Sequence, residues 1–222
     1  MGTGLSKSNL AYANENLDWH IFTDYAYILI AEAGKICTSN NYFQLEIEGN
    51  VYAVDSTTVD LCLNVFWWAK FRKNKAAVKI HTQYDVKNDI PSYINITDGS
   101  VHDVNFMDIM EYESGAYYVM DKGYVDFGRL YAIHDQNAFF ITRLKDNTNY
   151  RRIYSAKVNK STGVLCDQTI KLNNYIAAKK HPGKLRRIKY YDEIICMTLE
   201  FVTNNFLLPA LDIARLYSIV GV

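Results

Sequence analysis

The sequence predicts an α/β protein in which a mixed sheet is flanked by helices. Three observations support this class: short apolar runs bounded by turn residues, segments that alternate apolar and polar residues, and stretches with helical spacing. Two of the apolar runs end in a carboxylate, Val51–Asp55 and Ala116–Asp121. Runs of this kind are typical of strands buried on both faces. Because functional groups gather at the carboxyl ends of strands in open α/β sheets, the two aspartates are the first candidates for a functional site.

The elements follow one another in an order that narrows the topology. Three hairpin-linked strands, a helix, a strand, a helix and a strand form the layout of the ribonuclease-H-like fold. In that layout the first and fourth strands are neighbours, which brings Asp55 and Asp121 together. The predicted elements are a helix over 9–34, strands beginning at Val51 and over 76–85 and 91–97, a short helix capped by Ser100–Asp103, the Asp121 strand, a helix over 126–136 and a strand over 138–143.

These elements predict four regions along the chain. Residues 1–45 form an N-terminal helical segment, and residues 46–145 form the ribonuclease-H-like core. Residues 146–200, with short alternating segments between turn signals, form a β-rich insertion. Residues 201–222 form a return strand and the start of a final helix that Pro209 opens.

The composition is that of an ordinary globular protein, with 49% hydrophobic and 22% charged residues among 222, which excludes a disordered chain. The net charge is zero but unevenly divided. Residues 1–60 hold two basic residues against eight acids, and residues 61–222 hold 22 against 16. This asymmetry favours a polyanionic partner for the second part.

The four cysteines lie far apart without a C-x-x-C pair, which argues against a zinc site or a disulfide framework and favours a reducing compartment. No signal peptide and no apolar stretch of membrane-spanning length is visible. We therefore expect a soluble, cytoplasmic protein without a membrane partner.

Two adjacent carboxylates have a specific chemical use. They can share divalent ions that bind the attacking and leaving oxygens of a phosphoryl displacement. The alternative is structural, with Asp55 capping a turn through Ser56 and Thr57 and Asp121 beginning a loop. The fold layout, which places both residues at adjacent strand ends, favours the metal site.

Four motifs in order carry a resemblance to a known family: Val51–Thr58, Trp68–Lys73, Thr97–Asp103 and Tyr118–Tyr124. They resemble bacterial insertion-sequence transposases of the DDE class, in the large group numbered four, and the similarity runs from about Leu10 to Tyr217. The resemblance implies a ribonuclease-H-like catalytic domain with a β-rich insertion, dependence on Mg²⁺ or Mn²⁺, and cut-and-paste strand transfer. It also implies double-stranded DNA, as transposon ends and target, and a homodimer of the intact protein as partners. On that pattern Asp55 and Asp121 are the first two catalytic carboxylates and metal ligands.

The chain departs from this family at the third carboxylate. The family's signature on its last catalytic helix is Tyr-x-x-Arg-x-x-x-Glu-x-x-x-x-x-x-Lys. Tyr217 fits the first position, Val220 occupies the Arg position, and the Glu position falls beyond Val222. We therefore expect an inactive fragment, truncated at both ends. The alternatives are a non-catalytic DNA-binding or dominant-negative remnant, and a nuclease that takes its third acid from Glu200 or Asp212.

Three basic clusters are candidates for DNA contact. The first, between the first two long strands, has aromatic residues interleaved, which favours a phosphate-binding loop over a merely solvated one. The cluster consists of Lys70, Arg72, Lys73, Lys75 and Lys79, and its predicted DNA-binding residues are Lys70, Arg72, Lys73 and Lys75. For the other two clusters, DNA contact and a structural or solubilising role both stay open. They are Lys179, Lys180, Lys184, Arg186, Arg187 and Lys189, and Arg143, Lys145, Arg151 and Arg152.

A second group, His81, Asp85, Asp98, His102 and Asp103, contains residue types that bind metals. Turn chemistry and helix capping account for it better than a separate metal site.

Overall fold

The computed structural model describes residues 6–16, 18, 20–36, 45–61, 70–72 and 75–220. The chain divides into two compact units, Met1–Ser39 and Asn40–Val222. The first unit contains two helices, α1 (Lys7–Asn16) and α2 (His20–Ile36), where the sequence predicted one helix over 9–34. At the start of α2 the backbone N–H of His20 donates a hydrogen bond to a carboxylate oxygen of Asp18.

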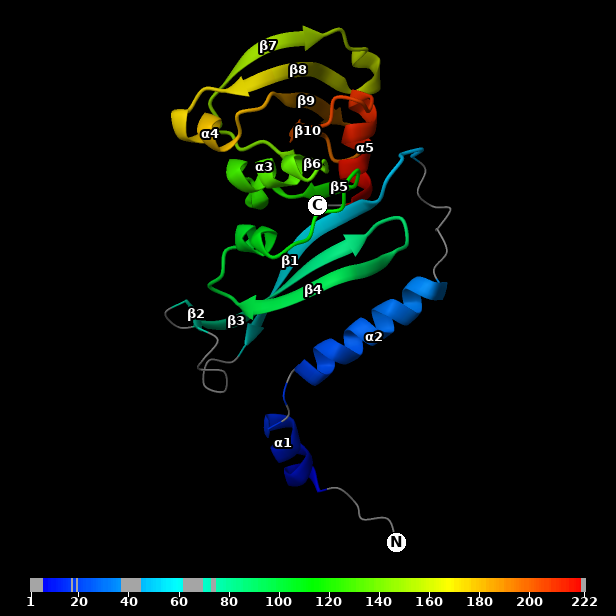
Figure 1. The fold of residues 1–222 in the computed structure, drawn as a ribbon, viewed down its shortest axis with the longest axis vertical. Helices are drawn as coiled ribbons and strands as arrows, with labels where there is room; N and C mark the ends of the chain where they lie inside the picture. Colours follow the sequence, from blue (N-terminus) through cyan, green and yellow to red (C-terminus); the bar gives the residue numbers. More distant parts are fainter. Residues whose placement is uncertain are drawn as a thin grey trace. The chain divides into compact units, whose positions relative to one another are not determined.

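The second unit is built on one mixed sheet. Among the described residues the sheet has ten strands, in the order β2-β3-β1-β5-β6-β10-β9-β8-β7, with β4 also paired to β3 (Figure 1). The strands are β1 (Val51–Leu61), β2 (Lys70–Arg72), β3 (Lys75–Asp85), β4 (Ile90–Asp98), β5 (Tyr117–Met120), β6 (Phe139–Arg143), β7 (Tyr150–Ala156), β8 (Val164–Leu172), β9 (Leu185–Asp192) and β10 (Met197–Thr203).

The predicted topology is present at the centre of this sheet. β1, β3 and β4 form an antiparallel meander, while β1, β5 and β6 run parallel to one another. This confirms the expected ribonuclease-H-like mixed sheet. The strands of residues 146–200 extend the same sheet, because β10 pairs antiparallel with both β6 and β9.

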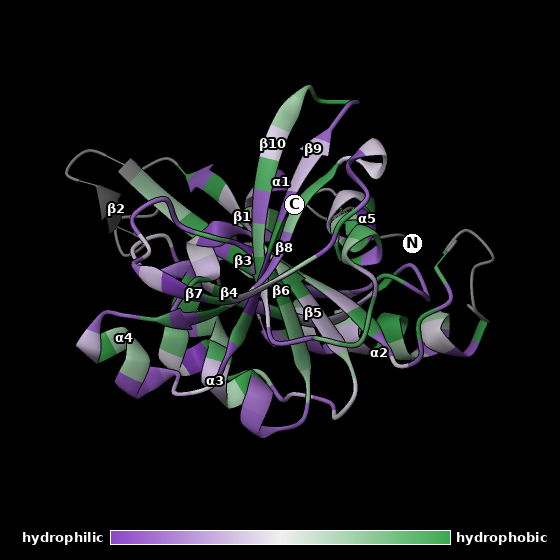
Figure 2. Cartoon of the chain, turned by 90° about the horizontal axis from the view of Figure 1, so that it is seen from above, coloured by the Kyte–Doolittle hydropathy of each residue, from purple (hydrophilic) through white to green (hydrophobic). Residues whose placement is uncertain are grey.

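Helices cover both faces of the sheet. They are η1 (Asp103–Asp108), η2 (Lys122–Tyr124), α3 (Phe127–Asp135), η3 (Lys160–Thr162), α4 (Tyr175–Lys180) and α5 (Ala210–Val220). One core cluster joins Phe106, Leu130 and Phe140 from η1, α3 and the sheet. The other joins Ile141 and Phe201 of the sheet to α5. Both α3 and α5 carry hydrophobic and hydrophilic residues, as expected for helices that pack by one side (Figure 2).

The register between β1 and β5 is set where the two strands begin. Gly49 has a φ of +83°, and a Cβ atom there would clash with the carbonyl oxygen of Gly115. The backbone N–H of Tyr117 donates to the carbonyl of Asn50 at 2.8 Å. Only glycine permits this left-handed, close approach, and every later pair of the two strands depends on it.

α5 is held over the sheet by a polar cluster at its start. Asn205 accepts hydrogen bonds from the N–H groups of Leu207 and Leu208, at 3.0 and 2.8 Å. The guanidinium of Arg186 donates to the carbonyl of Leu208 at 2.6 Å and pairs with Asp167 at 2.7 Å. Arg186 is only 7% exposed, so its guanidinium is bonded to groups inside the fold.

One helix prediction needs correction. The Ser100–Asp103 spacing predicted a capping box, but the element that follows is the 3₁₀ helix η1, which begins at Asp103 and has no side-chain cap. Ser100 instead bonds to Asp98, and Asp103 contacts the sheet. None of the described helices is long and apolar enough to cross a bilayer.

Candidate active site

Asp55 and Asp121 occupy equivalent positions on adjacent parallel strands. The last residue pair between β1 and β5 is Val54 with Met120, and Asp55 and Asp121 directly follow. Paired strands lie about 4.8 Å apart. The structure therefore brings these two sequence-predicted residues side by side.

Both aspartates face the α5 side of the sheet. Side chains alternate between faces along a strand, so Asp55 shares a face with Val51, and Asp121 with Val119. Val51 and Val119 belong to the core cluster that α5 covers. At the site Asp55 is exposed and Asp121 is half-buried, so both carboxylates stand at the border between core and solvent.

The turn-capping role considered for Asp55 does not match the structure, whereas Asp121 does begin the connection that follows β5. Asp55 does not end its strand or cap a turn, because β1 continues to Leu61. Only the pairing with β5 stops at Val54, after which β1 pairs with β3 alone. Asp121 has extended backbone angles before η2 and makes no side-chain cap. Its carbonyl accepts a 3.0 Å hydrogen bond from the hydroxyl of the buried Thr142, which fixes the backbone at this point.

Tyr124 of η2 lies three positions after Asp121. Its side chain is buried in the core on the opposite face of the sheet, and burial raises the pKa of its hydroxyl. The negative charges of Asp103, Asp55 and Asp121 raise this pKa further. Carboxylate oxygens such as those of Asp55 and Asp121 are the ligands that Mg²⁺ prefers.

A polar network that the sequence did not predict lies behind β1. The hydroxyl of Ser56 donates to Asp103 at 2.7 Å, and the ammonium of Lys79 lies 2.9 Å from the same carboxylate oxygen. Lys79 also donates to the carbonyl of Val101 at 2.9 Å. This network joins the segment before η1 to the strand that carries Asp55. Its only sequence signal, the Asp103 motif, had suggested a helix cap.

Arg143 and Tyr217 stand next to Asp121 on the α5 face. Met120 pairs with Thr142, so Arg143 on β6 follows in line with Asp121. Burial raises the pKa of Tyr217 to about 12, with the charge of Asp121 acting in the same direction and that of Arg143 opposing it. The residue that fits the family's helix signature therefore lies near the second aspartate.

Neither residue considered as a substitute third acid joins the pair. Glu200 forms a two-point ion pair with Arg187, at 2.6 and 2.7 Å. It also alternates with Phe201, which faces α5, so Glu200 points to the opposite face. Asp212 pairs with Arg215 on α5. Within the described part of the chain, no three His, Cys, Asp or Glu side chains are placed to hold a metal ion.

Turn chemistry accounts for Asp85 and Asp98 in the group around His81, as the sequence suggested, but helix capping does not occur, since η1 has no side-chain cap. Asp85 accepts hydrogen bonds from the backbone N–H groups of Lys87 and Asn88 in the β3–β4 turn. Asp98 accepts one from Ser100, and His81 contacts the hydroxyl of Thr97 at 3.0 Å.

For Lys70, Arg72 and Lys75 of the first basic cluster the structure describes the backbone positions. Lys70 and Arg72 lie on β2, which pairs with Ala76 and Lys75 at the start of β3. Part of the predicted loop is thus a short antiparallel strand. Lys73 lies outside the described residues.

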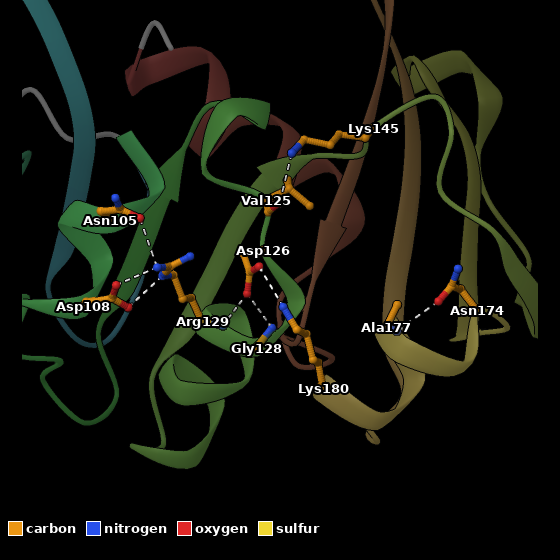
Figure 3. Close-up of polar contacts among 10 residues, drawn as sticks. All are labelled: Asn105, Asp108, Val125, Asp126, Gly128, Arg129, Lys145, Asn174, Ala177 and Lys180. Atoms are coloured by element: carbon orange, nitrogen blue, oxygen red, sulfur yellow. Dashed lines mark hydrogen bonds and ion pairs between the residues drawn. The ribbon is translucent and has the colours of Figure 1, made fainter. Parts of the chain in front are cut away.

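Several residues of the other basic clusters have structural partners. Arg186 and Arg187 pair with Asp167 and Glu200. Lys180 forms an ion pair of 3.2 Å with Asp126, the N-cap of α3, and Lys145 donates to the carbonyl of Val125 (Figure 3). The same close-up shows Arg129 paired with Asp108. These contacts favour the structural alternative for those positions.

Comparison with known proteins adds an independent finding. Residues 47–219 match the family described as "Transposase DDE domain". The chain is similar to "Putative transposase y4zB" of Sinorhizobium fredii (strain NBRC 101917 / NGR234), with 34% identity over 170 residues, 74% of this chain and 46% of that protein. It is also similar to "Probable transposase for insertion sequence element IS5377" of Geobacillus stearothermophilus, with 26% identity over 185 residues, 82% of this chain and 48% of that protein. The chain spans about half the length of these curated relatives.

Proposed function

This chain belongs to the family of DDE-domain transposases, and we propose that Asp55 and Asp121 are the first two catalytic carboxylates of its DNA phosphoryl-transfer site. The observation that carries the proposal is the β1–β5 register, which ends at Val54 and Met120 and leaves the two aspartates side by side. Their common orientation toward α5 supports a shared ligand.

The same two residues would hold the divalent ion, Mg²⁺ or Mn²⁺. Their hard oxygen donors fit such a cation. When bound, the ion supplies activation of the attacking water or hydroxyl and stabilisation of the departing oxygen. The chain's own contribution is to fix the two carboxylates, through the paired strands and through the bond from Thr142 to the Asp121 carbonyl.

Double-stranded DNA is the proposed partner, and the β2–β3 segment is the proposed contact. Lys70 and Arg72 lie on β2, which pairs with the start of β3 at Lys75, so three basic residues of the cluster belong to one short antiparallel segment. Lys73 extends this basic segment in the sequence. An intact protein of this kind would act in the cytoplasm as a homodimer.

A second candidate function has its own support. The described residues bring no third carboxylate to the pair, and Glu200 and Asp212 are engaged elsewhere. We therefore propose that the 222-residue polypeptide binds DNA weakly without cleaving it. Mg²⁺-dependent nicking that Asp121→Ala abolishes would overturn this inactivity.

Calorimetric titration with Mn²⁺ tests the metal site directly. We expect Asp55→Asn and Asp121→Asn each to weaken Mn²⁺ binding at least tenfold, because each removes one of two charged ligands. Asp60→Asn is the matched control: it lies on the same strand at a position of the opposite face. Unchanged affinity in either test variant, with thermal unfolding like the wild type, would remove that residue from the site.

A further inference from the structure

Arg143 stands in line with the two aspartates. It is the last residue of β6, and the preceding pair, Met120 with Thr142, places it directly beside Asp121 on the next parallel strand. Arg143 is also paired with Phe201 of β10, which lies in the core under α5. The three side chains of Asp55, Asp121 and Arg143 therefore form one row on one face of the sheet.

The surroundings of Arg143 differ from those of the other arginines in this part of the fold. Arg129, Arg186 and Arg187 each donate two hydrogen bonds to a carboxylate. Between described residues, no ion pair within 4.0 Å joins Arg143 to an acid, although Asp121 is its neighbour across the strands. Arg143 is half-buried, and its charge is not used in a two-point pair.

Helix α5 packs on the sheet face to which Asp121 and Arg143 belong. Tyr217 of α5 is buried in the core cluster that also contains Val119 and Ile141, which lie two positions before Asp121 and Arg143. Tyr217 therefore packs against the strands that carry Asp121 and Arg143 at their carboxyl ends.

We propose that Arg143 binds the DNA phosphate that the Asp55–Asp121 pair acts upon. This inference rests on the proposed function, because it assigns a substrate contact at that same site. A guanidinium presents a rigid fork of donors that matches two phosphate oxygens. A phosphate held between Arg143 and a metal on the aspartates would have positive charge on both sides.

The same geometry excludes a role for Arg143 in holding the metal. A cation one strand away repels a divalent ion, so Arg143 lowers the metal affinity of the aspartates. Loss of its charge should weaken DNA binding without weakening Mn²⁺ binding. A residue that merely stabilised the sheet would change both in the same direction.

The test uses the full chain and a short double-stranded DNA, with affinity followed by fluorescence anisotropy over a salt series. Each phosphate contact contributes roughly 0.9 to the slope of log affinity against log salt. We expect Arg143→Gln to reduce this slope by about one and the affinity by about tenfold at low salt. Arg143→Lys should keep the slope, since it keeps the charge.

Arg129→Gln is the matched control. It removes the same charge from α3, which packs on the other face, where Arg129 is already paired with Asp108. We expect it to leave the salt slope unchanged. By calorimetry, Mn²⁺ should bind Arg143→Gln at least as tightly as it binds the wild type.

Three results would overturn the inference: a wild-type affinity that does not depend on salt, a salt slope that Arg143→Gln leaves unchanged, or an Arg143→Gln variant that binds Mn²⁺ more weakly. Failure of the proposed function is a different outcome. It appears as unchanged Mn²⁺ binding in Asp55→Asn and Asp121→Asn, whatever Arg143→Gln does to DNA affinity.

Discussion

The hydroxyl of Ser56 and the ammonium of Lys79 meet on one carboxylate oxygen of Asp103, at 2.7 and 2.9 Å. Ser56 directly follows Asp55 on β1, while Asp103 opens η1, 47 positions later. The contact therefore ties the strand that carries the first aspartate to a distant segment. The side chain of Lys79 is only 12% exposed, so the network is partly shielded from water.

Asp103→Asn should destabilise the fold by about 1–3 kcal/mol at neutral pH, because it leaves the buried ammonium of Lys79 without its counter-charge. Burial opposes ionisation of Asp103, but Lys79 and Ser56 outweigh it and lower the pKa of the carboxyl. Because the pKa of Asp103 in the folded protein is below its unfolded value of 3.8, the ionised carboxylate stabilises the fold at pH values above 3.8. This stabilisation is lost as the pH falls through the folded pKa. Urea unfolding at neutral pH and at about pH 3 measures both effects.

The loop variant Asp146→Asn controls for a simple change of charge, since Asp146 is exposed. If Asp103→Asn unfolds at the same urea concentration as the wild type at neutral pH, the network does not stabilise the protein.

Glu200→Gln should destabilise the fold without affecting the metal. Its partner Arg187 has a side chain only 12% exposed, and removal of the counter-charge costs about 1–3 kcal/mol. Mn²⁺ affinity by calorimetry should match the wild type, because Glu200 lies on the opposite face from Asp55 and Asp121. The double variant Glu200→Gln with Arg187→Met should regain part of the stability, since no charge is then left unpaired. A loss of Mn²⁺ affinity equal to that of Asp121→Asn would instead make Glu200 a ligand.

His181 should make the protein less stable in mildly acidic solution. The side chain is 1% exposed, and burial, with a smaller effect from His134, lowers the pKa of its imidazole to about 4. The folded protein then keeps His181 neutral while the unfolded chain takes up a proton below its value of 6.5. Stability is therefore full above about pH 6.5 and falls as the pH drops toward 4, by up to about 1.4 kcal/mol per pH unit.

Urea unfolding between these pH values, compared in wild type and His181→Gln, measures this effect. In His181→Gln the free energy of unfolding should fall less steeply with decreasing pH than in the wild type. The control is His102→Gln, because His102 is exposed. Equal slopes in wild type and His181→Gln would show that His181 is not the group responsible.

Local sequence signals predicted much of the central sheet. The buried runs before Asp55 and Asp121 became the parallel pair β1 and β5, because consecutive apolar residues can be satisfied only between two covered faces. The Asn88–Asp89 turn and the helix after Asp126 also formed, since turn residues and an N-cap act through bonds to their own neighbourhood.

Contacts between residues that are distant in the sequence could not be predicted in the same way. Asp103 had the spacing of a cap but bonds to Ser56 and Lys79, which lie on other strands. Arg186 and Arg187 belonged to a basic cluster open to two interpretations, and their carboxylate partners lie on β8 and β10. Charge along the sequence does not reveal which cations are neutralised inside the fold.

The sequence by itself determined the strands, their order and the two aspartates that follow buried runs, because alternation and apolar spacing act along the chain. Only the tertiary structure decided that Asp55 and Asp121 share one face, with Arg143 beside them and Glu200 on the other. That choice depends on strand register, and a shift of one residue would turn every side chain of a strand to the opposite face.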